Sequence, residues 1–188
     1  MAELLITGDL VISDNTYQID KIDKNLIDMF QKSDYNIINL ECPVTDSNNK
    51  IVKTGPHLKG NATIIAKVLD ALNIDMVTLA NNHIMDYSEK GLKDTLSFCK
   101  KNNLQYVGAG TKLSEASLTK FIQVGKFRIA LVNIAENEWA SATLTSAGAN
   151  PVDIINNAKQ LQEAKLQADK VIVIVHGGHE YYNLPSPR

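Results

Sequence analysis

The chain has 188 residues, of which 44% are hydrophobic and 21% are charged, a balance typical of a globular domain with a sizeable core. Nineteen basic and twenty-one acidic side chains give a net charge of −2, and no basic block suggests nucleic acid or an anionic membrane surface as a partner. No run reaches the ~20 apolar residues that span a bilayer, so we expect no transmembrane segment.

The N-terminus leads almost directly into an apolar run, without the basic region and long apolar stretch of a signal peptide. The sequence as it stands therefore predicts a cytoplasmic chain, and association with the cell envelope requires that a native anchor was removed. The two cysteines, Cys42 and Cys99, fit no metal or redox spacing. We predict that both are buried free thiols.

Short apolar runs rich in Ile, Val and Leu alternate with amphipathic segments. The runs lie at residues 4–6, 36–40, 76–80, 127–132 and 171–175. Because their hydrophobicity is continuous rather than alternating, we expect strands buried on both faces, in a sheet that helices cover. Residues 121–124 and 127–132, joined by Gly125 and Lys126, predict a β-hairpin, so part of the sheet is antiparallel.

Four segments show the apolar spacing of helices. They lie at residues 25–32, 61–72, 88–102 and 151–168. Asn61 and Ser88 are the predicted N-caps of the second and third helices, and Pro151 is predicted to lie in the first turn of the fourth. Helices between consecutive strands favour right-handed crossovers and a mainly parallel sheet. The predicted fold class is therefore α/β.

The last apolar run is followed only by a short tail that ends Pro185-Ser186-Pro187-Arg188. An open sheet normally covers such a strand with a further helix and a neighbouring strand. We therefore expect a single domain over residues 1–188 that is cut short at its C-terminus.

Residue types that bind metals follow four of the predicted strands. Asp9 follows the first strand, Glu41 the second, Asn82 and His83 the third, and His176 the last. Ligands of open α/β sheets bind outside the carboxyl ends of the strands, so these side chains should meet at one edge. Oxygen and nitrogen donors without thiolate suit Mn²⁺, Fe²⁺ or Zn²⁺. We predict one or two divalent ions that activate water and hold a phosphoryl group.

Each of these residues also has a purely structural explanation. Asp9 could cap a helix, Glu41 could be a solvated loop residue, and Asn82 could serve a turn. Only the coincidence of such residues at four strand ends favours a site. His57 lies in the long polar segment 42–60 and is a candidate substrate contact, with an ordinary surface histidine as the alternative.

The same positions resemble a known family. The residues from Leu79 to His83, with Asp86 and Tyr87, resemble the "ANNH…DYG" signature of CapA-type proteins of poly-gamma-glutamate capsule biosynthesis, with Ser88 in place of the usual glycine. Further motifs of that family are resembled, in the same order, by Gly8-Asp9, Asn39-Leu40-Glu41, residues 106–110 and residues 176–181. The resemblance covers nearly the whole chain.

That family is similar to the calcineurin-like metallophosphoesterases, so the resemblance implies a metallophosphoesterase-like mixed β-sandwich flanked by helices. It implies four metal ligands, namely Asp9, Glu41, Asn82 and His176. It also implies that His83 lies beside the metal with the catalytic Asn82 and donates a proton to the leaving group. His179 or Glu180 would line the pocket as substrate contacts.

Two departures from the pattern concern activity. Phosphoesterases usually open with D-x-H, whereas the residue two positions after Asp9 is Val11. The family's final "G.HPH" segment, which would supply further histidine ligands, does not occur in this sequence. We therefore expect weaker metal binding, or one ion where the family holds two.

Three functions fit these observations. The first is a metal-dependent hydrolase that acts on a phosphoester or a related linkage of an anionic polymer during capsule or envelope biosynthesis. The second uses the same metal site to cleave or transfer γ-glutamyl amides. The third is not enzymatic: the domain binds the anionic polymer or capsule synthase subunits, which the missing D-x-H histidine favours.

Overall fold

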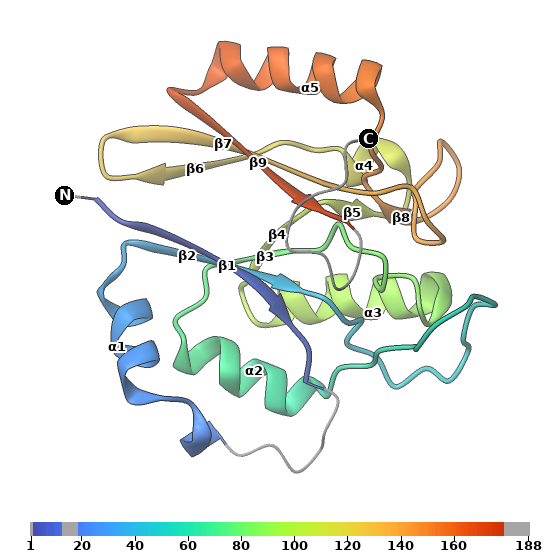
Figure 1. Ribbon diagram of the computed structural model, residues 1–188, viewed down its shortest axis with the longest axis horizontal. Coiled ribbons are helices and arrows are strands. Elements are labelled where there is room, and N and C mark those ends of the chain that lie inside the picture. The colour runs from blue at the N-terminus through green and yellow to red at the C-terminus, as the bar shows by residue number, and fades with distance from the viewer. Residues whose placement is uncertain (1, 13–18, 179–188) are drawn as a thin grey trace.

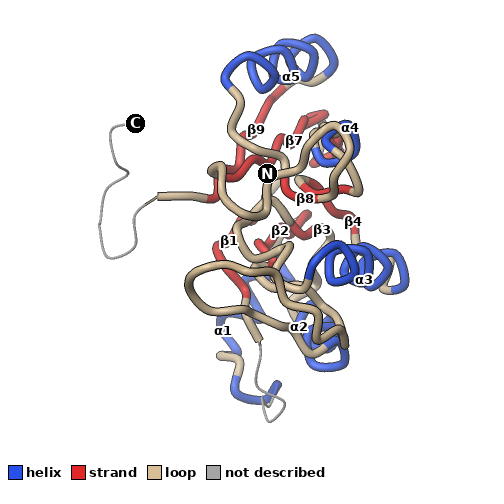
Figure 2. Tube along the Cα trace, turned by 90° about the vertical axis from the view of Figure 1, so that its right-hand side faces the viewer, coloured by secondary structure: helices blue, strands red, loops and turns tan. Residues whose placement is uncertain are grey.

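The computed structural model describes residues 2–12 and 19–178, and these form two β-sheets that face each other between two layers of helices (Figures 1 and 2). The first sheet contains, in spatial order, the parallel strands β1 (Leu4–Leu10), β2 (Tyr35–Leu40), β3 (Met76–Thr78) and β4 (Gln105–Val107). The second contains β6 (Lys120–Val124), β7 (Phe127–Ala135) and β9 (Lys170–His176). The mixed β-sandwich implied by the resemblance is therefore confirmed.

Helices cover the outer face of each sheet (Figure 1). The first sheet is covered by α1 (Lys24–Lys32), α2 (Ala62–Ala71) and α3 (Ser88–Lys101), and the second by α5 (Ile154–Gln167). The smaller elements are a 3-10 turn η1 (Ile19–Lys21), the short helix α4 (Leu113–Ala116), and a two-stranded pair formed by β5 (Ala109–Gly110) and β8 (Gly148–Ala149). None of the described helices is long and apolar enough to cross a membrane.

The strand β7 has apolar side chains packed on both of its faces. Ile129 and Leu131 belong to the apolar core between the two sheets, which includes Met76 of the first sheet. Ala130, on the opposite face of β7, packs in a separate cluster with Ala164 of α5. Because both faces are covered, the strand reads as a continuous apolar run, as the sequence predicted. The predicted β6–β7 hairpin and the parallel pairing of the other strands of these two sheets are also confirmed.

The buried side chain of Asn133 joins the two sheets. Asn133 lies on β7, and its Oδ1 accepts a hydrogen bond of 2.8 Å from the backbone N–H of Ala80, just beyond β3. Its Nδ2 donates to the carbonyl of Ile174 on β9 at 3.1 Å. A Cβ on Gly108, which has φ +96°, would lie only 2.0 Å from Asn133 Oδ1. The glycine therefore leaves the space that this amide occupies.

Two predicted helix starts are wrong. Ser88 has φ +59° and donates its hydroxyl to the carbonyl of Asn49 at 3.0 Å, so it does not cap α3; the N-cap position is Tyr87, without a side-chain cap. A left-handed backbone at this position suits glycine, the residue usual in the resembled motif. Pro151 forms a bridge with Ala135 instead of a first helical turn, and α5 begins after the N-cap Asp153.

Other local predictions are confirmed. Asn61 caps α2, with its Oδ1 accepting a hydrogen bond from the N–H of Ile64 at 3.0 Å. Cys42 and Cys99 are free and fully buried. Burial raises the pKa of Cys42 to about 11 and that of Cys99 to about 12, so both behave as small apolar side chains at neutral pH.

Within the described residues, β9 pairs with a strand on one side only, that of β7. Its valines Val173 and Val175 are 40% and 58% exposed. This strand is therefore an edge of the second sheet with apolar side chains in contact with solvent.

We expect Asn133→Leu to lower the free energy of unfolding by about 3 kcal/mol, because a side chain of similar shape removes one buried and one partly buried hydrogen bond and leaves the Ala80 N–H without its partner. Urea titration of the purified variant measures the change. Gln123→Leu on the neighbouring strand β6, where the side chain is exposed, serves as the control and should change stability by less than about 0.5 kcal/mol. Equal effects of the two substitutions would contradict the role of Asn133.

Candidate metal centre

The carboxyl ends of strands from both sheets lie at one side of the molecule (Figure 1). The pairing of β1 with β2 shifts its register between Thr7 and Asp9, and such bulges redirect the side chains that follow. Asp9 then lies opposite Asn39, whose Nδ2 donates to Asp9 Oδ1 at 2.6 Å. The bulge and this hydrogen bond fix the first carboxylate of the site.

Three side chains from different strands converge here. Asp9, Glu41 and His176 each offer one ligand atom, and these atoms all lie within 4.8 Å of one another. A ring nitrogen of His176 lies 3.6 Å from Asp9 Oδ1, and the other lies 3.5 Å from Glu41 Oε1. Asn82 adds an amide oxygen 3.1 Å from His176 Nε2. Two carboxylates, an imidazole and an amide oxygen form a set that could hold a divalent cation.

These residues open onto a cleft of about 570 Å³. Its lining includes the four residues of this set, together with His83 and the two carboxylates Glu136 and Glu138. Among the described residues that line the cleft, none is a lysine or an arginine. The cleft therefore carries a concentration of negative charge that favours cations.

Asn39, which is almost fully buried, organises the cluster from beneath. Besides its bond to Asp9, its Nδ2 lies 3.3 Å from His176 Nδ1. Its Oδ1 accepts from Thr78 Oγ1 at 3.2 Å and from Asn81 Nδ2 at 3.3 Å. One amide thus connects strand ends of both sheets, and its two ends are distinguished by these partners.

His83 is held by a buried carboxylate. Its Nδ1 lies 2.7 Å from Asp86 Oδ2, and the Asp86 side chain has no exposed surface. Because a carboxylate can only accept, Nδ1 carries the proton in this bond. Nε2 is left as the ring nitrogen available to the cleft that His83 lines.

Opposing effects act on the acidity of Asp86. Burial alone raises the pKa of this carboxyl group, but hydrogen bonds from His83, from Lys53 and from the Leu58 N–H outweigh burial and hold the pKa of Asp86 below its ordinary value. Asp86 is therefore ionised at neutral pH. Its carboxylate contacts both Lys53 and the Leu58 N–H, and so binds the two ends of the segment from Lys53 to Leu58.

The structure brings five of the predicted residues together and leaves one apart. His57 does not line the cleft: its Nε2 lies 2.8 Å from the carbonyl of Ile51, and its ring meets that of Tyr87 edge-on with centroids 6.4 Å apart. The predicted contacts His179 and Glu180 lie outside the described residues.

Several residues of the site were not found from the sequence. Glu136 directly follows β7, so the strand-end rule that selected Asp9 and Glu41 could have selected it. Its Oε2 accepts a hydrogen bond of 3.1 Å from the N–H of Gly178. Asn39 belongs to the Asn39-Leu40-Glu41 motif of the resemblance but was given no role in the site. Lys53 gave no comparable signal, because its partners His83 and Asp86 are distant in sequence.

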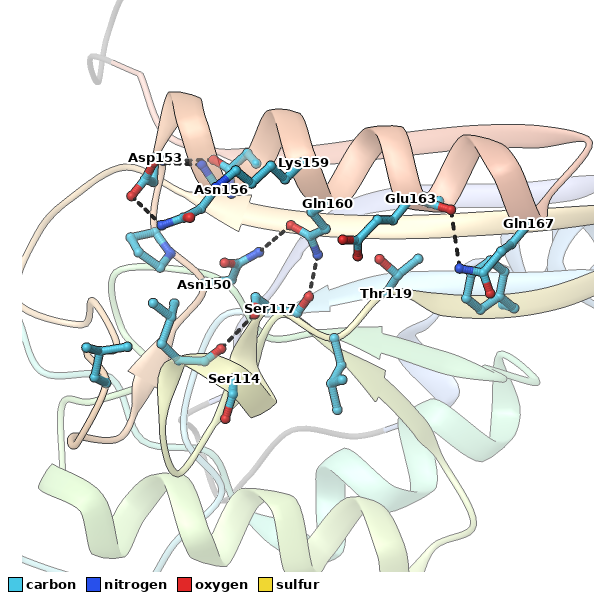
Figure 3. Close-up of a pocket in the computed structure, with 17 residues that line it drawn as sticks. Ser114, Ser117, Thr119, Asn150, Asp153, Asn156, Lys159, Gln160, Glu163 and Gln167 are labelled. Carbon is cyan, nitrogen blue, oxygen red and sulfur yellow. Dashed lines mark hydrogen bonds between the residues drawn. The ribbon is translucent and has the colours of Figure 1, made fainter.

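A second hollow of about 580 Å³ lies between α5 and the segment from Leu113 to Phe121 (Figure 3). Its wall is tied by Gln160, which donates to the carbonyl of Ser117 at 2.5 Å and lies 3.4 Å from Asn150. Its lining is mostly amides, hydroxyls and apolar side chains. None of the described residues that line it is a predicted site residue.

Sequence comparison identifies relatives of this chain. Residues 3–188 match the family described as bacterial capsule synthesis protein PGA_cap. The chain belongs to this family. It is 36% identical over 173 residues to the PGA biosynthesis protein CapA of Bacillus subtilis (strain 168), covering 90% of this chain and 45% of that protein. It is 31% identical over 183 residues to the capsule biosynthesis protein CapA of Bacillus anthracis, covering 93% and 44%. The chain spans about half the length of these curated relatives.

Solved structures with this fold include one described as a phosphatase. A phosphatase from Mycoplasma pneumoniae has a TM-score of 0.55 and 18% identity, with 95% of this chain and 56% of that chain covered. A hypothetical protein from Thermus thermophilus has a TM-score of 0.56 and 17% identity, with 94% and 58% covered. At such identities the likeness shows the fold, which is phosphoesterase-like as the resemblance implied.

We expect Asp86→Asn to weaken the acid dependence of stability. The folded-state pKa of Asp86 lies below its ordinary value of 3.8, so its carboxylate stabilises the fold above that value, and this contribution is lost as the pH falls through the folded-state pKa. Urea titrations at several values below about pH 4 should show a shallower decline for Asp86→Asn than for the unaltered protein. Asp70→Asn, at an exposed position of α2, should keep the steeper decline. Identical slopes for all three proteins would contradict this assignment.

Proposed function

We propose that this chain forms the catalytic domain of a metal-dependent hydrolase that cleaves phosphoester linkages during the synthesis of a capsule or envelope polymer. The observation that carries the proposal is the convergence of Asp9, Glu41 and His176, whose ligand atoms lie within 4.8 Å of one another, in a cleft that His83 also lines. A set of possible cation ligands beside a proton donor is an arrangement that metal-dependent hydrolysis can use.

The residues present fit a divalent metal ion. Asp9 and Glu41 place two carboxylates close together, and no lysine or arginine is among the described residues that line the cleft. Asp9, Glu41, Asn82 and His176 would hold the ion, and the donor set suits Mn²⁺, Fe²⁺ or Zn²⁺. When bound, the ion supplies Lewis-acid activation of water and of the phosphoryl group.

His83 would donate the proton that the leaving oxygen needs. In this step the ring is doubly protonated: the Nδ1–H stays bonded to Asp86 at 2.7 Å, and the Nε2–H would pass to the leaving oxygen of a substrate in the cleft that His83 lines. His83 is 8% exposed, so its ring is screened from bulk water while it remains in reach of the cleft. Asn82 directly precedes His83 in the sequence, so a proposed metal ligand and the proposed proton donor are adjacent in the chain.

The relatives support capsule biosynthesis as the process. Two of them are named for PGA or capsule biosynthesis, which favours an anionic polymer as the ultimate substrate or product and capsule synthase subunits as partners. The PGA in one name also favours a second substrate class, a γ-glutamyl amide, because an activated water attacks a carbonyl as well as phosphorus.

Passive binding of an anionic polymer fits this cleft less well. Glu136 and Glu138 add two carboxylates to those of Asp9 and Glu41, and like charges repel a polyanion unless a cation lies between them. The cleft therefore supports a metal-dependent role over a metal-free binding role.

We expect the purified protein to retain about one or two equivalents of divalent metal after dialysis against Mn²⁺, Fe²⁺ or Zn²⁺, as measured by elemental analysis. The double variant Asp9→Asn and Glu41→Gln should lose that metal, because both anionic ligands are removed. Glu163→Gln, in the hollow beside α5, is the matched control and should retain it. Full metal content in the double variant would show that Asp9 and Glu41 are not the metal ligands.

We expect the metal-loaded protein to hydrolyse 4-nitrophenyl phosphate and His83→Gln to lower kcat by about 10²- to 10⁴-fold, the usual contribution of a general acid. Metal content should stay unchanged, and His57→Gln, outside the cleft, should leave kcat unaffected. If the protein hydrolyses γ-glutamyl-4-nitroanilide and not 4-nitrophenyl phosphate, the substrate class is a γ-glutamyl amide and not a phosphoester. Turnover of neither substrate by the metal-loaded protein would refute the proposal.

A further inference from the structure

A buried lysine lies behind the proton donor, in the long connection between β2 and α2. The Lys53 side chain is only 3% exposed and forms an ion pair with Asp86, whose side chain has no exposed surface. Lysine is rarely buried, because its ammonium group loses its hydration. Lys53 is not among the described residues that line the cleft.

The Asp86 carboxylate is contacted by N–H groups from the connection between β2 and α2 and from the site. Lys53 Nζ meets Oδ1, while His83 Nδ1 and the N–H of Leu58 both lie 2.7 Å from Oδ2. The Asp86 carbonyl accepts a further bond of 3.1 Å from the N–H of Ile51. Both carboxylate oxygens are thus held, so the carboxylate cannot rotate freely under the His83 ring.

Lys53 also touches the histidine itself. Its Nζ lies 3.2 Å from His83 Nδ1, and both groups are donors to the same carboxylate. Folding alone gives little reason for this arrangement, because a buried ion pair is seldom more stabilising than an apolar pair of the same size. The placement of the ammonium group against the proton-donating ring accounts for it better.

We propose that Lys53 is a positioning residue for His83: by fixing the Asp86 carboxylate it keeps the Nδ1–H of the ring bonded to Asp86, which leaves Nε2 for the proton that the doubly protonated ring donates in the cleft. Its kinetic consequence rests on the proposed hydrolase function, whereas its structural consequence does not. Because Lys53 and Leu58 belong to the same connection, the conformation of this segment and the orientation of the proton donor are coupled.

The structural test uses Lys53→Met, which keeps the length of the side chain and removes its charge and its hydrogen bonds. Long-range ¹H–¹⁵N spectra of protein labelled in histidine, recorded with and without Zn²⁺, report which ring nitrogen of His83 carries the proton. We expect one Nδ1-protonated form in the unaltered protein and a mixture of forms in Lys53→Met. Lys59→Met is the matched control, since Lys59 bonds Ser47 and Asn48 of the same connection and should leave the single form. A single Nδ1-protonated form in Lys53→Met overturns the proposal.

The kinetic test separates positioning from general damage to the fold. If Lys53 acts through the proton donor, its loss matters most where the leaving group needs a proton. Lys53→Met should therefore lower kcat for phenyl phosphate at least about tenfold more than kcat for 4-nitrophenyl phosphate, with KM unchanged for both. An equal loss for both substrates overturns the proposal. If the unaltered protein hydrolyses neither, the proposed function fails, and the spectra still decide the role of Lys53.

A second variant guards against a failure of Lys53→Met to fold, because that variant leaves Asp86 as an unpaired buried charge. The double variant Lys53→Met and Asp86→Asn contains neither charge. We expect it to show the same mixture of His83 forms. One ordered Nδ1-protonated ring in the double variant overturns the proposal.

Discussion

The candidate metal centre depends on how two separately hydrogen-bonded sheets are placed against each other, and the amide of Asn133 fixes that placement. Asp9 and Glu41 come from the first sheet, whereas His176 ends β9 of the second. Asn133 bonds the Ala80 N–H of the first layer and the Ile174 carbonyl of β9. Because a hydrogen bond has strict geometry, this amide adds directional bonds to the apolar core between the two sheets.

The sequence predicted those parts of the site that follow from local order along the chain. Buried strands read as apolar runs, and the rule for their carboxyl ends placed Asp9, Glu41 and His176 at one edge, where the structure has them. The rule needs only the type and direction of each strand. It says nothing of how two sheets face each other, which is why the resemblance to a known family was needed to predict a sandwich.

Contacts between buried polar groups escaped prediction for a physical reason. Lys53 reaches Asp86 across a loop, and Asn39 reaches His176 from the other sheet; neither contact leaves a periodic pattern in the sequence. Ser88 and Pro151 were misplaced for a different reason. Each has a side chain typical of a helix start, but tertiary contacts with Asn49 and Ala135 give it another role. Local preference is weak beside such contacts.

The exposed edge of β9 has a consequence for the behaviour of this chain in concentrated solution. An edge strand offers a row of free N–H and C=O groups, and proteins usually protect such rows with charges, prolines or bulges. Between Lys170 and His176 the strand has only aliphatic side chains, and Val173 and Val175 face solvent. Unless another segment covers it, two copies can join edge to edge through backbone hydrogen bonds. Such pairing grows with protein concentration, so the state of association of this chain would depend on how concentrated the solution is.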